Sequence, residues 1–290
     1  MKLLSGFAIV ITVALVCWTD SKLDQWEDEQ QVMAINLLSS VATPYAPLQE
    51  WDDLPAIVQD YLSHVVDNNK SAQTAKAFSV KQEGEFLMKK DQYVPFTAQE
   101  IFVMNPPGFA WEGKIAMVPS VPNWFPKLFV SDSWVEQEGH FRAAVQAIVP
   151  ILSLDSSTTS TGGDGASGQM TLGQATRWLA DAVLLPSSLH PDAGIVTWKS
   201  VDDAPEKAIL ELPIANIHGL KLEATFDGGD SQGLLTKVTG QKPFMRSKND
   251  FEMKTWQVNF LDYQRQEENG MMVPMKMESG WINEEGDFEA

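Results

Sequence analysis

Residues 171–186 read TLGQATRWLADAVLLP, and this stretch decides the predicted fold. No proline interrupts residues 171–185, and the apolar side chains recur at the spacing of an α-helix. Thr171 followed by Gln174 is typical of a helix start, and Pro186 is typical of a helix stop. We therefore predict one long helix over residues 171–185. Its apolar side comprises Leu172, Ala175, Trp178, Leu179, Ala182, Val183 and Leu185.

A separate polar stripe on the same helix consists of Gln174, Arg177 and Asp181. Arg177 and Asp181 are four residues apart, so the two side chains can form an ion pair. One interpretation is a structural ion pair that anchors the helix to a sheet, where burial would require further hydrogen bonds. The other interpretation is the polar floor of a ligand pocket. The pair is therefore a candidate binding site whose role stays open at this stage.

Five tryptophans are flanked by apolar residues and have the same two possible roles. They either pack in the core or line a hydrophobic cavity. With Arg177 and Asp181 they complete the candidate ligand-binding set. The five are Trp111, Trp178, Trp198, Trp256 and Trp281.

On both sides of the predicted helix the apolar period falls towards two, as in Leu220, Leu222, Ala224 and Phe226. We predict about eleven strands, nearly all joined by short turns. A parallel sheet would need a helical crossover between strands, so the sheet is predicted to be antiparallel. A sheet of this size should curl, with the helix on its concave side. The expected class is α+β, with a half-barrel packed around one long helix.

The N-terminal part of the chain is predicted to lie outside that domain. Residues 3–18 form an apolar run after Lys2, which indicates a cleaved signal peptide, a retained membrane anchor or a lipoprotein leader. Each would place the rest of the chain outside the cytoplasm, in the periplasm, outside the cell or anchored facing outward. Residues 19–50 read as an acidic stalk and residues 51–290 as a single β-rich domain. A helix over Pro55–Val66 should close one end of the sheet.

Two longer connections are predicted within the domain. The Pro-rich segment Val118–Pro126 is either a loop pinned by its aromatic side chains or an apolar lip over a cavity. The Ser- and Gly-rich segment Ser153–Gly168 is predicted to be a flexible polar loop, without the spacing of a phosphate-binding loop.

Charge and motifs exclude several function classes. The formal net charge of −18 repels nucleic acid and anionic lipid headgroups. Cys17 is the single cysteine, so an intramolecular disulfide is impossible. The four histidines lack metal-ligand spacing, and no G-x-S-x-G motif occurs. The sequence therefore predicts no metal, no cofactor and no catalytic residues.

From about Leu54 to Phe288 the order of motifs resembles a family of uncharacterised bacterial proteins with a domain of unknown function. Asp181 stands where that family usually has Glu, and the segment 153–168 resembles an insertion. The resemblance implies an exported β-rich domain and assigns no catalytic residues. The matching motifs are Leu54-Pro55 with Tyr61, Gly84, Pro95–Gln99, Pro107–Trp111, Leu172, Arg177–Asp181 with Pro186, Val196–Trp198, Trp256, Tyr263, Val273-Pro274 and Trp281.

These patterns favour an exported or membrane-tethered protein that binds an apolar or amphipathic, lipid-like molecule in the concave face of a curved sheet. The analogy to lipid carriers is one of fold alone. Two alternatives remain open. The first is a non-catalytic structural or interaction module with a filled core, and the second is a hydrolase with an unrecognised site. A membrane is a further expected partner if residues 3–18 are retained.

Overall fold

A computed structural model gives the fold of the chain. It describes residues 2–42, 45–66, 75–89, 91–117, 126–156, 166–214, 217, 219–227, 233–247 and 250–289, with backbone alone for residues 2–20, 166 and 167. Most of the predicted loops Val118–Pro126 and Ser153–Gly168 lie outside these residues. Within the described part, Ser153–Asp155 belong to a strand and residues 166–168 to a helix.

Two antiparallel sheets account for the strands, and every pairing joins neighbours in the sequence. The six-stranded sheet contains β1 (Ala77–Lys89), β2 (Gln92–Val103), β3 (Gly108–Ala116), β4 (Lys127–Val135), β5 (Glu138–Val145) and β6 (Val149–Asp155). The seven-stranded sheet contains β7 (Thr197–Ser200), β8 (Lys207–Glu211), β9 (Lys221–Phe226), β10 (Leu235–Ser247), β11 (Asp250–Arg265), β12 (Met272–Ile282) and β13 (Phe288–Glu289). Short turns make these neighbours pair, because a tight turn can join only antiparallel strands.

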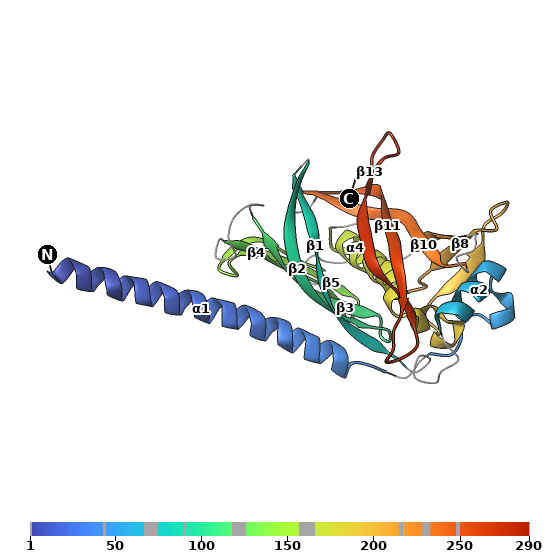
Figure 1. Ribbon diagram of the computed structural model, residues 1–290, viewed down its shortest axis with the longest axis horizontal. Helices are drawn as coiled ribbons and strands as arrows, with labels where there is room; N and C mark the ends of the chain where they lie inside the picture. The colour runs from blue at the N-terminus through green and yellow to red at the C-terminus, as the bar shows by residue number, and fades with distance from the viewer. Residues whose placement is uncertain are drawn as a thin grey trace.

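The helix α4 (Ala166–Asp181) lies between the two sheets (Figure 1). It contacts β3–β6 of the first sheet and β9–β11 of the second. The helix begins five residues before the predicted Thr171, so the capping interpretation of Thr171 and Gln174 is wrong. It ends at Asp181, and a short 3-10 turn, Ala182–Leu184, continues the chain to Pro186.

The interior on both sides of α4 is filled by apolar side chains. Trp178, Leu179 and Val183 are fully buried. The Trp178 ring stacks on Phe102 of β2, with ring centroids 5.1 Å apart, and its Nε1 donates to the carbonyl of Val103 at 3.0 Å. One continuous apolar core therefore joins α4 to both sheets.

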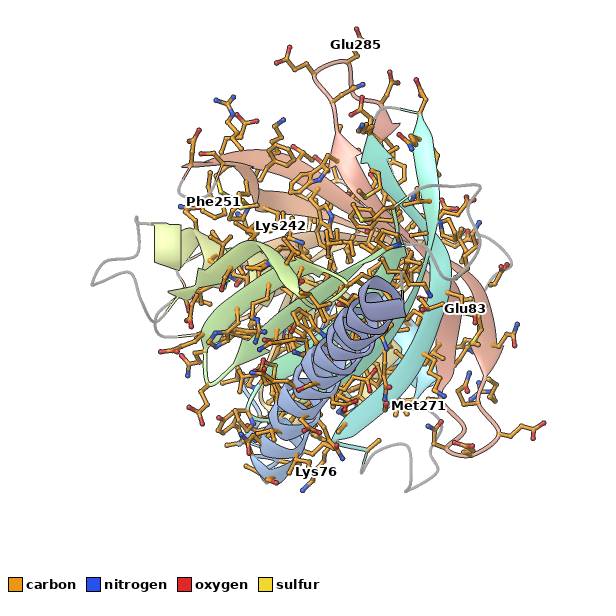
Figure 2. The ribbon with its side chains drawn as sticks, turned by 90° about the vertical axis from the view of Figure 1, so that its left-hand side faces the viewer. Lys76, Glu83, Lys242, Phe251, Met271 and Glu285 are labelled. Carbon is orange, nitrogen blue, oxygen red and sulfur yellow. The ribbon has the colours of Figure 1, made fainter. Side chains whose placement is uncertain are left out.

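Two other helices pack outside this interior. α2 (Ala56–Val65) covers one end of the seven-stranded sheet, close to the predicted span, and buries Val58, Tyr61 and Leu62. α1 (Lys2–Ser39) is a single helix that includes residues 19–39 of the predicted stalk 19–50. Its C-terminal half crosses the outer face of the six-stranded sheet, and its N-terminal end projects away from it (Figures 1 and 2).

The contact of α1 with the sheet rests on a few side chains. Trp26, Gln30 and Leu37 are the buried residues of its described side chains. Trp26 packs edge-on against Phe129 of β4 at 6.2 Å, and Gln30 accepts a hydrogen bond from Ser131 at 2.7 Å. Among the residues whose side chains are described, no helix is both long and apolar enough to cross a membrane.

The α+β class and the antiparallel pairing are confirmed. The prediction of a single half-barrel of about eleven strands around one long helix is not confirmed, because the strands divide into two sheets and three helices are present among the described residues. The division falls between β6 and β7, where α4 and a run of 3-10 turns replace the short connections. Because α4 separates β6 from β7, these two strands cannot form a hairpin.

Candidate functional site

The most unusual feature between the sheets is a charge cluster centred on Arg177. Arg177 leaves α4 and donates to Asp132 of β4, with Nη1 and Oδ2 2.7 Å apart. Its Nε donates to Asp181 at 3.1 Å, which is the pair that helical spacing predicts. Its Nη2 lies 3.5 Å from Oε2 of Glu100 on β2. One guanidinium therefore ties α4 to two strands of the six-stranded sheet.

Aromatic rings hold the same guanidinium in place. Its Cζ lies 4.8 Å from the ring centre of Phe109 and 5.1 Å from that of Trp111, both on β3. A planar guanidinium is attracted to the faces of such rings, and the attraction grows as water is excluded. The Arg177 side chain is 19% exposed, so one side of the cluster reaches solvent.

A second layer of polar groups donates to two of the carboxylates, while Glu100 Oε1 is buried without a hydrogen-bond partner among the described residues. Gln174 donates to Asp132. Gln82 of β1 donates to Glu100 at 2.9 Å, and Trp111 Nε1 donates to Gln82 at 2.7 Å. Hydrogen bonds of this kind reduce the cost of burying charged groups. These hydrogen bonds, together with the Arg177–Glu100 ion pair, therefore connect α4 with β1, β2, β3 and β4.

Burial changes the protonation of this cluster. Loss of water, reinforced by Asp181, raises the pKa of Glu100 to about 8, and burial also raises the pKa of Asp181. The pKa of Arg177 is raised further above its usual range by the surrounding carboxylates, against the effect of desolvation.

Lys242 of β10, in the seven-stranded sheet, interacts electrostatically with the same cluster. Burial, with repulsion from Arg177, lowers the pKa of Lys242 to about 8. Its Nζ lies 4.0 Å from the ring centre of Trp256 on β11.

This arrangement favours holding elements together over attacking a substrate. Glu100 has the pKa of a group that could donate a proton near neutral pH, but its side chain is only 1% exposed. A general acid must come within hydrogen-bond reach of the group that it protonates. Arg177, a cation beside aromatic rings, has the most accessible side chain of its ion pairs, at 19% exposed against 13% for Asp132 and 11% for Asp181.

The structure brings some of the predicted site residues together and separates others. Arg177, Asp181 and Trp111 meet in the cluster, and Trp256 joins it through Lys242. Trp281 faces Trp256 across the β11–β12 pair and packs edge-on against Phe244 at 5.1 Å. Trp178 is buried in the core below. Trp198 lies elsewhere, with its Nε1 bonded to the carbonyl of Leu189 and its ring near Phe226.

Sequence reasoning missed Glu100, Asp132 and Lys242. Glu100 and Asp132 could have been found from the alternation of inward- and outward-facing positions along their strands. Glu100 shares its strand face with Ala98 and Phe102, which are buried, and Asp132 shares its face with Val130 and Trp134. A charged residue at an inward-facing position requires a partner, and Arg177 was the cation available on the predicted central helix.

Comparison with protein families finds a match over residues 52–290 to the family described as "Family of unknown function (DUF6920)". No curated protein matches the chain. No solved structure matches it either. The match begins after α1 and takes in α2, both sheets and the whole Arg177 cluster. The resemblance to a family with a domain of unknown function is thereby confirmed, and the chain belongs to this family of unknown function.

Proposed function

We propose that this chain is a non-catalytic structural or interaction module whose two sheets are locked onto α4, with binding surfaces outside the interior. The observation that carries the proposal is the filled interior. Trp178 and Leu179 on α4 and Val183 in the 3-10 turn after it are fully buried, and so are Leu222 and Val238 of the seven-stranded sheet. A guest between the sheets would have to displace such side chains, and protein interiors are close-packed.

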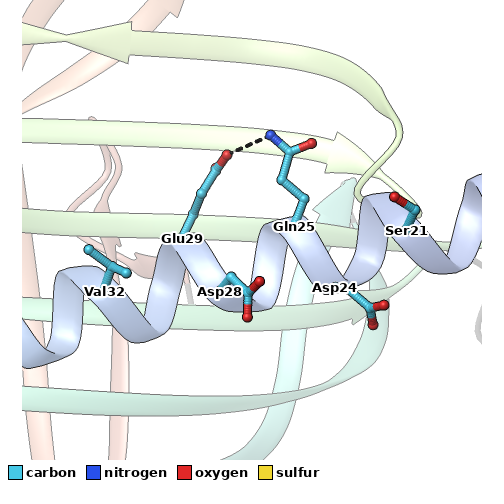
Figure 3. A pocket seen from close by; sticks show the side chains of 6 residues that line it. All are labelled: Ser21, Asp24, Gln25, Asp28, Glu29 and Val32. Carbon is cyan, nitrogen blue, oxygen red and sulfur yellow. Dashed lines mark hydrogen bonds between the residues drawn. The ribbon is translucent and has the colours of Figure 1, made fainter.

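Surface depressions on the molecule are consistent with this proposal. One of about 530 Å³ follows α1 and is lined by Ser21, Asp24, Gln25, Asp28, Glu29 and Val32 (Figure 3). Another of about 200 Å³ lies between α1 and the β5–β6 edge, with Trp26, Arg142 and Leu152 among its lining residues. The first is lined by α1 residues alone, and the second lies on the outer face of the six-stranded sheet, away from α4.

A dye-binding experiment with a cavity variant tests the filled interior. We expect the wild-type chain to show no saturable site for an apolar dye. Leu179→Ala removes a fully buried side chain beside Trp178 and should open an apolar cavity, because surrounding side chains relax only in part. That variant is the positive control and should gain dye binding. Saturable binding to the wild-type chain, unchanged in the variant, would contradict the proposal.

An apolar or amphipathic ligand is the second candidate function. The partly exposed Arg177 favours it, because Arg177 and Lys242 lie beside the rings of Trp111 and Trp256. An amphipathic molecule with an anionic group would suit cations flanked by aromatic rings. Native mass spectrometry of protein from its own host should then detect a bound lipid-like molecule. Its absence, together with no dye binding, would eliminate this candidate.

We further propose that residues 3–18 export the chain or tether it to a membrane. Their uninterrupted apolar sequence after Lys2 supports this. Fractionation of host cells, with and without these residues, tests it. Loss of export or of membrane association in the truncated chain is expected, and a truncated chain that fractionates like the full chain would refute the proposal.

A further inference from the structure

We propose that Glu138, His140 and Asp155 form a binding site for a divalent transition-metal ion of the Zn²⁺ class on the outer face of the six-stranded sheet. Each offers one potential ligand atom, and these three atoms lie within 4.8 Å of one another. Ligands bound to one zinc ion at about 2.0–2.2 Å are themselves separated by only a few ångströms. The group is therefore close to the arrangement that an ion requires.

Strand pairing produces this group. Glu138 and His140 are two residues apart on β5, so their side chains lie on the same face. Asp155 of β6 is the cross-strand partner of His140, and His140 Nδ1 lies 3.2 Å from Asp155 Oδ1. Histidine spacing in the sequence could not reveal the group, because its third member comes from another strand.

The backbone around the three side chains is held in place. Glu136 and Gln137 form the β4–β5 turn with positive φ angles of 54° and 67°, which fixes where β5 begins. The amide of Gly139, between the two β5 ligands, donates to Ser156 Oγ at 2.8 Å. This bond ties the residue after Asp155 to β5. The ligands therefore need little rearrangement to bind an ion.

Ser133 provides an independent observation at the same place. It is the β4 partner of His140, so its side chain lies on the same face of the sheet. The residue is fully buried, and its Oγ has no hydrogen-bond partner among the described residues. Buried hydroxyl groups are normally bonded. A water molecule on a metal ion at His140 would supply the missing partner.

The donor set selects the class of ion. One imidazole nitrogen with carboxylate oxygens suits Zn²⁺ and its first-row neighbours, whereas Ca²⁺ and Mg²⁺ prefer sites made of oxygen atoms alone. Three protein ligands leave a further position for water, as in zinc sites that are open to reactants. The net charge of −18 also favours accumulation of cations near the surface.

Calorimetric titration of the full chain with ZnCl₂, after removal of metal with a chelator, tests the site. We expect one saturable site per chain that Ca²⁺ does not occupy. His140→Ala and Asp155→Asn should each weaken binding by about tenfold or more, since each removes a ligand. Co²⁺ in place of Zn²⁺ should give visible absorption bands that disappear in His140→Ala.

His190→Ala is the matched control. His190 Nδ1 also lies near a carboxylate, 3.5 Å from Asp192, but no third ligand group accompanies that pair among the described residues. This variant should bind Zn²⁺ like the wild-type chain. Ser133→Ala should bind with a smaller loss than the ligand variants. His140 and Asp155 are 29% and 39% exposed, so these variants should keep the wild-type circular dichroism spectrum.

Three results would overturn the proposal. The first is a wild-type chain with no saturable Zn²⁺ binding. The second is unchanged affinity in His140→Ala, which would place the ion elsewhere. The third is an equal loss in His190→Ala, which would indicate nonspecific binding by surface histidines. None of these results bears on the filled interior, so the site and the proposed module role are tested separately.

Discussion

Arg177 and Arg142 have the same kinds of partner in two very different settings. Each donates to a carboxylate at 2.7 Å, Arg177 to Asp132 and Arg142 to Glu29 of α1. Each also lies 4.8 Å from an aromatic ring, that of Phe109 or that of Trp26. The Arg177 side chain is 19% exposed between the sheets, whereas the Arg142 side chain is 40% exposed under α1.

The comparison shows that two ion pairs with similar geometry are expected to contribute differently to the free energy of unfolding. A pair open to water competes with solvent and salt, and such pairs contribute about 0–1 kcal/mol. Removing one partner of a buried pair leaves an uncompensated charge and costs about 3–5 kcal/mol. We therefore interpret the Arg177 cluster as the fixed connection of the fold. The contact of α1 with the sheet should be the weaker one.

The largest expected effect is that of Arg177→Met. The variant keeps an apolar stem but leaves Asp132 and Asp181 buried without their cation. The free energy of unfolding should fall by about 3–5 kcal/mol in urea titrations. Arg177→Lys is the control that keeps the charge and loses the forked hydrogen bonds. Its free energy of unfolding should lie between those of the wild-type chain and Arg177→Met. A change below about 1 kcal/mol in Arg177→Met, with loss of a bound ligand, would favour the pocket interpretation instead.

Trp26→Ala should have the next largest effect, confined to α1. Trp26, Phe129 and Ala144 form a small apolar cluster separate from the main core. Loss of a buried Trp costs about 3–5 kcal/mol in a core, and a value near the lower limit is expected here because α1 can shift to close the gap. Hydrogen exchange should quicken in residues 21–39 and stay unchanged in β7–β12. Equal acceleration in both sheets would show that α1 belongs to the same cooperative unit.

Glu100→Gln should remove a pH dependence between about pH 4.5 and 8. The folded chain holds the Glu100 proton more tightly than the unfolded chain, because its pKa is raised to about 8. Wild-type stability should therefore fall as pH rises through this window, by about 3 kcal/mol at most between pH 5 and 7.5. The variant, which cannot ionise, should lack this fall. Parallel stability curves for the two proteins would contradict the raised pKa.

Arg142→Met should have the smallest effect. The pair with Glu29 is more than one-third exposed, so its loss should change the free energy of unfolding by less than about 1 kcal/mol. Arg142 also lowers the pKa of Glu29, which adds stability only above the normal titration range of that carboxyl. A double-mutant cycle with Glu29→Gln measures the coupling. A coupling as large as the Arg177 effect would remove the distinction between the two settings.

Local patterns predicted most of the elements, because period and turn residues are local. The apolar face of α4, the α2 span and the alternation of β9 all follow from neighbouring residues. The start of α4 could not be predicted in this way, because Ala166-Ser167-Gly168 ends a Ser- and Gly-rich run that is typical of a loop.

Contacts between residues far apart in the chain could not be predicted from the sequence. The ion pair of Arg177 with Asp181 was predictable from helical spacing, whereas Asp132 and Glu100 come from strands 45 or more positions away. The division into two sheets likewise depends on where α4 packs. The roles of Arg177, Asp181 and the five tryptophans as ligand contacts stay predictions.

The unbroken length of α1 has a mechanical consequence. A helix rises 1.5 Å per residue, so the first turn of α1 is carried about 36 Å from the Trp26 contact. Anything joined to that end would be kept at a set distance from the sheet by a stiff rod. A sideways force at that end would exert a large torque on the few side chains around Trp26. A modest force would therefore be enough to detach α1 from the sheet.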